Sequence, residues 1–312
     1  MDNGSRDGSV KWLRKTYPSV RIRTLSQNVG FAQGNNEGYR IAKGDFIVFL
    51  NNDTEVYPDF IDEMVAKWQS DKTIGGVQSK LFLMDTPLKL DSVGAFFTWS
   101  GFLYHWGFGK KDSTLYDKTT KLFTAKGACM GFPRYVLEDV LVNGVIFDPS
   151  YFSYFEETDL CHRIWLTGRT IQYVPKSIVY HQMGGTSTSM NNAYIQFHSY
   201  KNRIRSYLKN FQWRNLWFLL PHLFLCIVIA FVLFLQGKPS YSWAILKAIA
   251  WNTVHFSETL RKRSYIQKHI RLVPDSSYMS FILVFPKFDY YMHLFQGTVG
   301  YKEKEWIEYS QV

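Results

Sequence analysis

Residues 44–55 read Gly-Asp-Phe-Ile-Val-Phe-Leu-Asn-Asn-Asp-Thr-Glu, and their central run of five apolar residues decides the fold class. A short apolar run rich in β-branched and aromatic residues is typical of a buried strand in a parallel sheet. Open α/β sheets bind their ligands at the carboxyl ends of such strands. Asp53 follows this end, where a carboxylate could hold a hard metal ion. An ordinary Asn/Asp turn explains the same residues, so both interpretations stay open at this point.

Helix and strand patterns alternate around this run. We expect a helix over residues 35–43, the strand at 46–50, a helix that begins at Pro58, and a further strand over 74–78. Residues 84–121 are rich in glycine and aromatic residues and indicate a loop or insertion over the sheet edge. The alternation predicts an α/β fold, a Rossmann-like and mainly parallel sheet flanked by helices.

The positive charge of the chain is concentrated in its C-terminal third. The formal net charge is +10, and residues 201–312 hold 15 Lys and Arg against 6 Asp and Glu. The same third contains the longest apolar run, 216–235, whose only polar side chain is His222. Basic, aromatic and apolar composition together favours an anionic membrane surface over nucleic acid. The three cysteines are too few and too scattered for a disulfide framework or a zinc cluster.

The apolar run at 216–235 could meet a membrane in several ways. Twenty helical residues extend over about 30 Å, the thickness of the hydrocarbon core. One spanning helix, a re-entrant hairpin, helices lying in the interface and a hairpin packed on the soluble domain all remain open. Basic residues between 261 and 271 follow a second apolar segment and suit anionic headgroups. We therefore predict two regions, an α/β domain over 1–205 and a helical, membrane-associated region over 206–312.

A second group of carboxylates follows an aromatic stretch at residues 151–155. Glu156, Glu157 and Asp159 lie within four residues. Asp159 and Arg163 stand at i and i+4 of the expected helix and can form an ion pair. A carboxylate beside apolar groups binds its proton more tightly and can serve as a general base.

Further candidates lie near the expected sheet edge. His181 follows a strand and could share one divalent ion with Asp53, although a lone histidine is more often structural. Asp2 stands in a turn where its carboxylate could accept hydrogen bonds from a nucleotide. The Gly/Asn loop over residues 28–36 precedes a helix and suits close approach of a ligand.

Taken in chain order, four of these segments resemble the motifs of family 2 glycosyltransferases with the GT-A fold. The resemblance extends over residues 2–210. It is closest to the rhamnosyltransferase-like branch, which builds bacterial surface polysaccharides. The motifs are Asp2-Asn3-Gly4-Ser5, Asn28-Val29-Gly30-Phe31-Ala32, Leu50-Asn51-Asn52-Asp53-Thr54 and Tyr154-Phe155-Glu156-Glu157-Thr158-Asp159-Leu160-Cys161.

The resemblance implies a role for each candidate residue. Glu157, with Glu156 beside it, would be the catalytic base. Asp53 and His181 would bind Mg²⁺ or Mn²⁺, with Asp159 and Arg163 as supporting residues. The implied donor-binding residues are Asp2, Asn28, Gly30, Asn35, Asn51 and Asp53.

The resemblance also implies a function. It is the inverting transfer of one sugar from a nucleotide-sugar, of rhamnose or a similar hexose, to a glycan or lipid-linked acceptor. The place would be the cytoplasmic face of the bacterial inner membrane. The signature Gln-x-x-Arg-Trp of processive synthases is missing, which favours single-sugar transfer. Nucleic acid is not an expected partner.

The chain departs from the family pattern at three points. We expect the first strand, helix and second strand of the fold to be missing, as in a chain truncated at its N-terminus. Asn51 replaces the first aspartate of the D-x-D motif, and Glu157 stands where aspartate is more common. Two alternatives follow: a non-catalytic remnant of the fold that acts as a membrane-associated binding protein, and a nucleotidyltransferase with a similar sheet.

Overall fold

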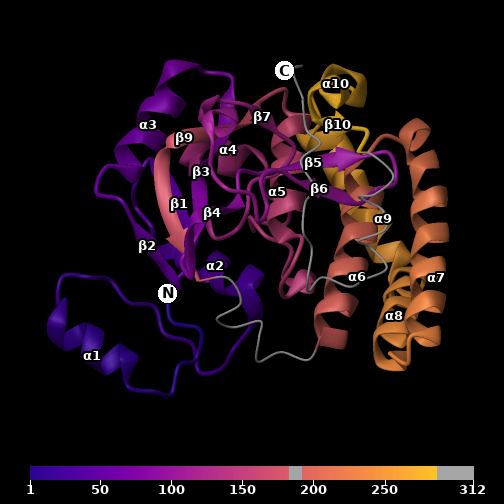
Figure 1. The fold of residues 1–312 in the computed structure, drawn as a ribbon, viewed down its shortest axis with the longest axis horizontal. Helices are drawn as coiled ribbons and strands as arrows, with labels where there is room; N and C mark the ends of the chain where they lie inside the picture. The colour runs from indigo at the N-terminus through magenta and orange to yellow at the C-terminus, as the bar shows by residue number, and fades with distance from the viewer. Residues whose placement is uncertain (183–191, 287–312) are drawn as a thin grey trace.

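The computed structural model describes residues 1–182 and 192–286, which form a main sheet, a smaller sheet and the helices packed on them (Figure 1). The main sheet follows the order β1-β8-β3-β9-β2, with β4 paired to β3 and β7 paired to β9. Its strands are β1 (Phe46–Leu50), β2 (Thr54–Val56), β3 (Ile74–Leu83), β4 (Thr86–Ser92), β7 (Lys121–Leu122), β8 (Cys129–Pro133) and β9 (Thr170–His181). The smaller sheet has the order β10-β5-β6, formed by β5 (Ala95–Thr98), β6 (Leu103–His105) and β10 (Leu283–Val284).

The expected α/β fold is confirmed, but the main sheet is mixed rather than mainly parallel. β3 and β9 pair in parallel, whereas β8 runs antiparallel to both of its neighbours, β1 and β3. β1, β3 and β9 therefore point the same way, with β8 reversed among them. The physical reason is the connection: β8 follows the excursion through β4 to β7, not the helical crossover that parallel neighbours need.

The decisive run forms β1 over the predicted residues, although only one of its faces is buried. Ile47 and Phe49 lie in the core, while Phe46 and Val48 are half-buried and Leu50 is exposed. Successive side chains of a strand point to opposite faces, so Ile47 and Phe49 pack in the large core while Phe46 and Val48 pack against a second, smaller cluster.

Residues 84–121 are not the loop that the sequence suggested. They contribute β4, β5 and β6, and their aromatic side chains enter the core. Phe96, Phe97, Tyr104 and Trp106 are all buried. Local glycine content favoured a loop, but burial of these large rings favours strands that reach the core.

The helices lie on both sides of the main sheet and at one end of the molecule. In Figure 1, α6 to α9 stand together on the right, and α5 lies between them and the main sheet. They are α1 (Ser9–Thr16), α2 (Gly30–Ile41), α3 (Phe60–Ser70), α4 (Arg134–Asp139), α5 (Glu156–Leu166), α6 (Asn192–Asn210), α7 (Leu219–Leu235), α8 (Pro239–Val254), α9 (Phe256–Tyr265) and α10 (Met279–Ile282).

The C-terminal region shares a core with the first part of the chain. Phe211, Phe218, Ile266 and Tyr278 belong to the same buried cluster as the side chains of β5 and α5. α6 runs across the expected boundary at residue 205. The division into two regions stays a prediction, and residues 287–312 of the second region lie outside the described residues.

Most of the basic residues between 261 and 271 are engaged within the protein. Lys262 pairs with Asp148 at 2.8 Å, and Arg271 pairs with Asp275 at 2.8 Å. Arg263 is buried and donates hydrogen bonds to backbone carbonyl groups. These side chains neutralise buried carboxylates and cap helix ends. Arg261 and Lys268 are exposed, and contact of the cluster with headgroups stays a prediction.

Candidate active site

The end of β1 brings Asp53 beside His181. The turn after β1 is held by the Asn51 amide, which donates to the Ala128 carbonyl at 3.0 Å. The chain then enters β2, which pairs antiparallel with β9 so that Thr54 stands opposite His181. Asp53 Oδ1 lies 3.4 Å from His181 Nε2. The predicted neighbourhood of these two side chains is thus formed by a strand pair.

A buried carboxylate orients His181 from behind. Asp91 Oδ2 lies 2.8 Å from His181 Nδ1, and Asp91 Oδ1 accepts a hydrogen bond from Lys126 Nζ at 2.5 Å. Burial alone would raise the pKa of Asp91, but Lys126 and His181 outweigh it and the pKa is lowered. Ionised Asp91 is an acceptor for Nδ1–H, and this hydrogen bond fixes the imidazole with Nε2 on the side of Asp53.

These groups fit a divalent ion. Asp53 Oδ1 is buried and accepts no hydrogen bond from the described residues, so it has a free lone pair. A carboxylate and an imidazole are both ligands for Mn²⁺, and a carboxylate suits Mg²⁺. Within residues 1–182 and 192–286, no three His, Cys, Asp or Glu side chains gather around one point. The described residues therefore bring together two candidate ligands, Asp53 and His181.

Two glutamates with raised pKa values begin α5. Glu156 is buried, and burial together with the charge of Glu157 raises its pKa well above the usual range. Burial raises the pKa of Glu157 to about 7, against the opposing charge of Lys126. Glu157 is half-buried and so remains partly open to solvent. A carboxylate that titrates near neutral pH is suited to general base chemistry.

The aromatic loop before these glutamates is strained. Phe152, Tyr154 and Phe155 all have positive φ angles, of 64°, 71° and 72°. Side chains other than glycine rarely adopt such angles, and surrounding contacts must hold them there. Asn202 of α6 supplies these contacts, since its Nδ2 donates to the carbonyl groups of Tyr151, Ser153 and Tyr154 at 3.0, 2.9 and 2.6 Å.

The loop also packs on the start of α2. The Ala32 amide donates to the Phe152 carbonyl at 3.0 Å. Gly30 has φ 83°, and a Cβ there would stand 2.5 Å from the same carbonyl oxygen. Glycine is thus required at position 30 by both conformation and space. The Gly/Asn loop and the acidic helix start are therefore neighbours.

The other predicted donor-binding residues are held by local hydrogen bonds. Asp2 forms a bridge with Thr24, and its Oδ1 accepts from the Ser5 amide at 3.2 Å. Asn28 Oδ1 accepts from the Gly30 amide at 2.8 Å, and Asn35 Nδ2 donates to the Phe31 carbonyl at 3.0 Å. The Asn51 backbone carbonyl accepts from the Thr54 hydroxyl. Their contact with a donor stays a prediction.

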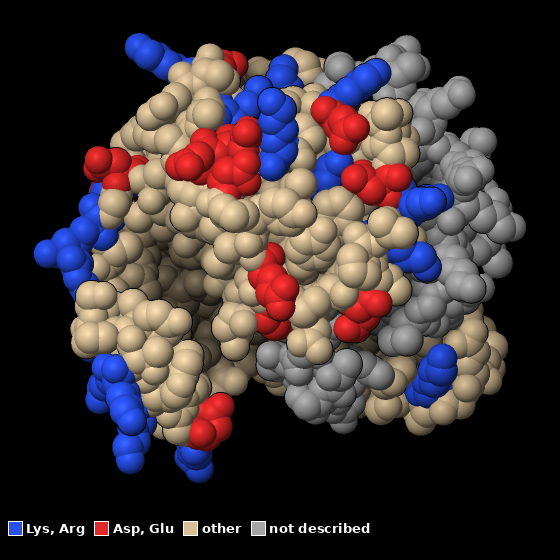
Figure 2. Space-filling model, turned by 60° about the vertical axis from the view of Figure 1, so that its left-hand side comes forward, with Lys and Arg blue, Asp and Glu red and all other residues tan. Residues whose placement is uncertain are grey.

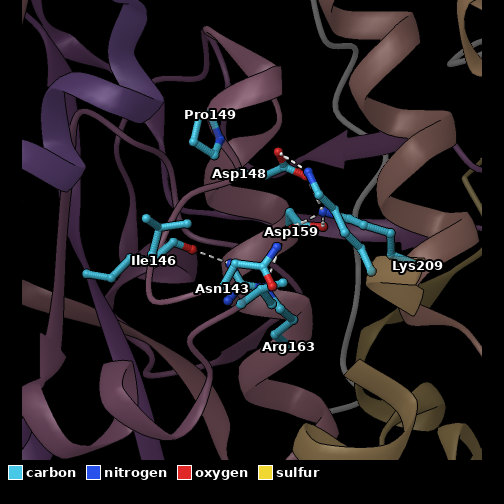
Figure 3. Close-up of a pocket in the computed structure, with 10 residues that line it drawn as sticks. Asn143, Ile146, Asp148, Pro149, Asp159, Arg163 and Lys209 are labelled. Atoms are coloured by element: carbon cyan, nitrogen blue, oxygen red, sulfur yellow. Dashed lines mark hydrogen bonds and ion pairs between the residues drawn. The ribbon is translucent and has the colours of Figure 1, made fainter. Parts of the chain in front are cut away.

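Asp159 and Arg163 form the expected ion pair, in a cavity of their own (Figure 3). Arg163 Nε lies 3.3 Å from Asp159 Oδ2, and Lys209 lies 3.1 Å from each of Asp148 and Asp159. Burial would raise the pKa of Asp159, but Lys209 and Arg163 outweigh it and the pKa is lowered. The cavity beside them has a volume of about 210 Å³. These charges tie α5 to α6, which supports the position of the glutamates.

The face shown in Figure 2 is hollowed. The wall of the hollow is formed mainly by uncharged residues, and acidic and basic side chains gather on the surface around it.

Sequence reasoning missed three residues that organise this site. Asp91 lies in a segment that was expected to be a loop, Lys126 stands between motifs, and Asn202 is far along the chain from the residues that it holds. Each acts through a contact between residues 35 or more apart in sequence. No local pattern marks such residues.

Comparison with known proteins agrees with this architecture. Residues 1–141 match the sequence model of the family described as glycosyl transferase family 2. The solved structure of GalNAc-T7 with UDP, GalNAc and Mn²⁺ is similar over 65% of this chain and 39% of that protein, with a TM-score of 0.50 and 16% identity. At this identity the likeness concerns the fold alone.

Two proteins of Escherichia coli (strain K12) are similar in sequence. The rhamnosyltransferase WbbL is 32% identical over 156 residues, which is 47% of this chain and 58% of WbbL. The uncharacterized glycosyltransferase YibD is 32% identical over 69 residues, 21% of this chain and 20% of YibD. The matches thus span less than two thirds of either relative.

The fold and the sequence matches point to one class of protein: the chain is similar to glycosyltransferases. Within that class, residues 1–141 match the model of glycosyl transferase family 2, and the chain is similar to the rhamnosyltransferase WbbL.

Proposed function

We propose that this chain is an inverting, metal-dependent glycosyltransferase that moves one sugar from a nucleotide-sugar to an acceptor hydroxyl. The observation that carries the proposal is Asp53 facing His181 at 3.4 Å, with Asp91 behind the imidazole. A free carboxylate oxygen and an oriented imidazole form a site for Mg²⁺ or Mn²⁺ beside a diphosphate. When bound there, the ion would stabilise the negative charge of the departing diphosphate.

Glu157 is the base of the proposed reaction. Its carboxylate takes the proton of the acceptor hydroxyl while the hydroxyl oxygen bonds to the anomeric carbon. The bond from that carbon to the diphosphate breaks, and a nucleoside diphosphate leaves with the electron pair. Attack from the side opposite the leaving group inverts the anomeric centre, and holding both reactants in line supplies much of the rate enhancement.

The proposal also names a class of donor and a class of acceptor. The name of the relative WbbL supports a rhamnose-type or similar hexose donor. Asp2, Asn28, Gly30, Asn35 and Asn51 would bind the nucleotide part. A glycan or a lipid-linked glycan would be the acceptor, in the synthesis of a bacterial surface polysaccharide.

We further propose a location at the cytoplasmic face of the bacterial inner membrane, with residues 206–312 as the membrane-associated region. Within the described residues, the stretch Trp213–Leu235 is long and apolar enough to cross a membrane. Only 39% of its most apolar part is buried inside the protein, which leaves an extensive surface for lipid.

The test is a transfer assay with matched variants. The chain is incubated with Mn²⁺, a panel of nucleotide-sugars and a lipid-linked glycan acceptor, and release of nucleoside diphosphate is measured. We expect turnover with one donor, loss of more than about 100-fold in Glu157→Gln, and no change in Glu138→Gln, an exposed glutamate of α4. Absence of turnover with every donor, while nucleotide still binds, would support the non-catalytic alternative.

A further inference from the structure

The two faces of α7 differ sharply. Seven large apolar side chains lie on its outer face or on the short 3₁₀ turn before it, and each is between 53% and 72% exposed. Their spacing alternates between four and three residues, which places the five on α7 along one side of the helix, with Trp213 and Trp217 before them on the 3₁₀ turn. This group, here named the α7 ridge, consists of Trp213, Trp217, Leu220, Phe224, Ile227, Phe231 and Phe234.

The inner face of α7 is part of the protein core. Cys226, Ile229 and Leu233 pack with Phe102 and with side chains of α6 and α8. His222 Nδ1 bonds to the Ser100 carbonyl at 2.9 Å, which ties the start of α7 to the β5–β6 connection. Figure 1 shows α7 as the outermost helix at one end of the molecule, with α8 beside it.

We propose that the α7 ridge inserts into one leaflet of a lipid bilayer, with the helix axis in the plane of the membrane, and that α7 does not span it. The inference deepens the membrane part of the proposed function and does not depend on sugar transfer. A spanning helix is surrounded by lipid, whereas the inner face of α7 is covered by α8 and by the buried cluster that includes Phe102 and Tyr200. Crossing the bilayer would carry the buried cations of α6, such as Lys201 and Arg205, into hydrocarbon.

The chemistry of the ridge favours lipid over a second copy of the chain. The ridge contains no charge and no amide, and its two tryptophans stand together at one end beside the exposed Arg214. Tryptophan next to a basic side chain is typical of the membrane–water interface. Trp243 and Leu246 of α8 are also exposed, with Lys247 next to them. A protein interface of this length would normally include a polar rim with hydrogen bonds.

Vesicle binding of the whole chain tests the surface. Phe224→Glu/Phe231→Glu changes two exposed ridge positions, and Leu88→Glu is the matched control at a 70% exposed apolar position of β4. With vesicles of phosphatidylcholine and phosphatidylglycerol, we expect the ridge variant to bind at least tenfold more weakly and the control to bind like the unchanged chain. Equal binding by the ridge variant overturns the proposal. So does a stable dimer in solution that only the ridge variant disrupts.

Labelling of a single introduced cysteine tests the orientation, even if the ridge variant does not fold. All three natural cysteines are buried, so Gln236→Cys and Arg214→Cys add exposed thiols at the two ends of the apolar segment. The protein is added to the outside of preformed vesicles, followed by a membrane-impermeant maleimide. An in-plane helix leaves both thiols reactive. Protection of Cys at position 236 together with reactivity at position 214 would show a spanning helix and contradict the proposal.

Discussion

At the scale of single residues, burial sets the pKa of Glu157, the proposed base. Burial raises its pKa to about 7 from the ordinary 4.5, so that the ionised base forms only near neutral pH. We therefore expect kcat to rise about tenfold per pH unit between pH 5 and 6.5 and to level off above pH 8.

The raised pKa of Glu157 also makes the free energy of unfolding depend on pH, and this contribution falls as the pH rises. The folded protein favours the neutral form of Glu157. Its contribution to the free energy of unfolding is therefore complete below pH 4.5 and is lost as the pH rises through 7. Glu157→Gln should flatten this part of the dependence of unfolding free energy on pH, measured by denaturant titration. A pH–rate profile that is flat between pH 5 and 8 would remove Glu157 from the role of base.

Asp91 is a positioning residue, because it acts on the proposed metal ligand His181 and not on the substrate. Asp91→Asn keeps the shape but removes the charge that fixes the imidazole. We expect Mn²⁺ to bind about 10- to 100-fold more weakly, measured by the paramagnetic resonance of free Mn²⁺. The control is Asp85→Asn, an exposed carboxylate near the end of β3. Unchanged Mn²⁺ affinity in Asp91→Asn would mean that His181 does not bind the ion through Nε2.

At the scale of elements, part of the site was predictable and part was not. The apolar run predicted β1 over the correct residues and placed Asp53 at its end, because both depend on neighbours in the sequence. The pair of Asp159 and Arg163 followed from helical spacing alone. The reversed strand β8 and the partners Asp91 and Asn202 depend on contacts between distant segments, which no local periodicity encodes.

The strained loop before α5 gives a prediction about Asn202. Asn202→Leu removes the donor of the Ser153 and Tyr154 carbonyl groups, while the Tyr151 carbonyl still accepts from the Ser153 amide. The loss should cost about 1–3 kcal/mol of unfolding free energy. Because Glu156 and Glu157 follow the loop directly, we also expect a marked loss of kcat.

The matched control is Asn252→Leu, which removes buried hydrogen bonds to the carbonyl groups of Lys201 and Ala248 in the helical region. It should destabilise the fold to a similar degree while kcat stays near that of the unchanged chain. A similar kcat for both variants, measured well below their melting temperatures, would contradict the role given to Asn202.

At the scale of the whole molecule, the C-terminal helices share the large core with the first part of the chain. Removing residues 212–312 would delete Phe218, Ile266 and Tyr278 from the large core, and β10 from the small sheet. We expect this truncation to aggregate or to unfold below about 37 °C, since each lost core side chain costs 2–5 kcal/mol. Circular dichroism during heating checks it. A truncated chain that melts like the full chain would show that two independent domains exist.

In the proposed function, Asp53 and His181 hold a divalent ion that binds a nucleoside diphosphate. The most direct measurement is calorimetric titration of the chain with UDP, GDP and dTDP, with and without Mn²⁺, for the unchanged chain, Asp53→Asn and Asp85→Asn. We predict that one nucleotide binds only with Mn²⁺, and that Asp53→Asn weakens this binding more than tenfold while Asp85→Asn does not. Binding of equal strength without Mn²⁺, or in Asp53→Asn, would contradict the account.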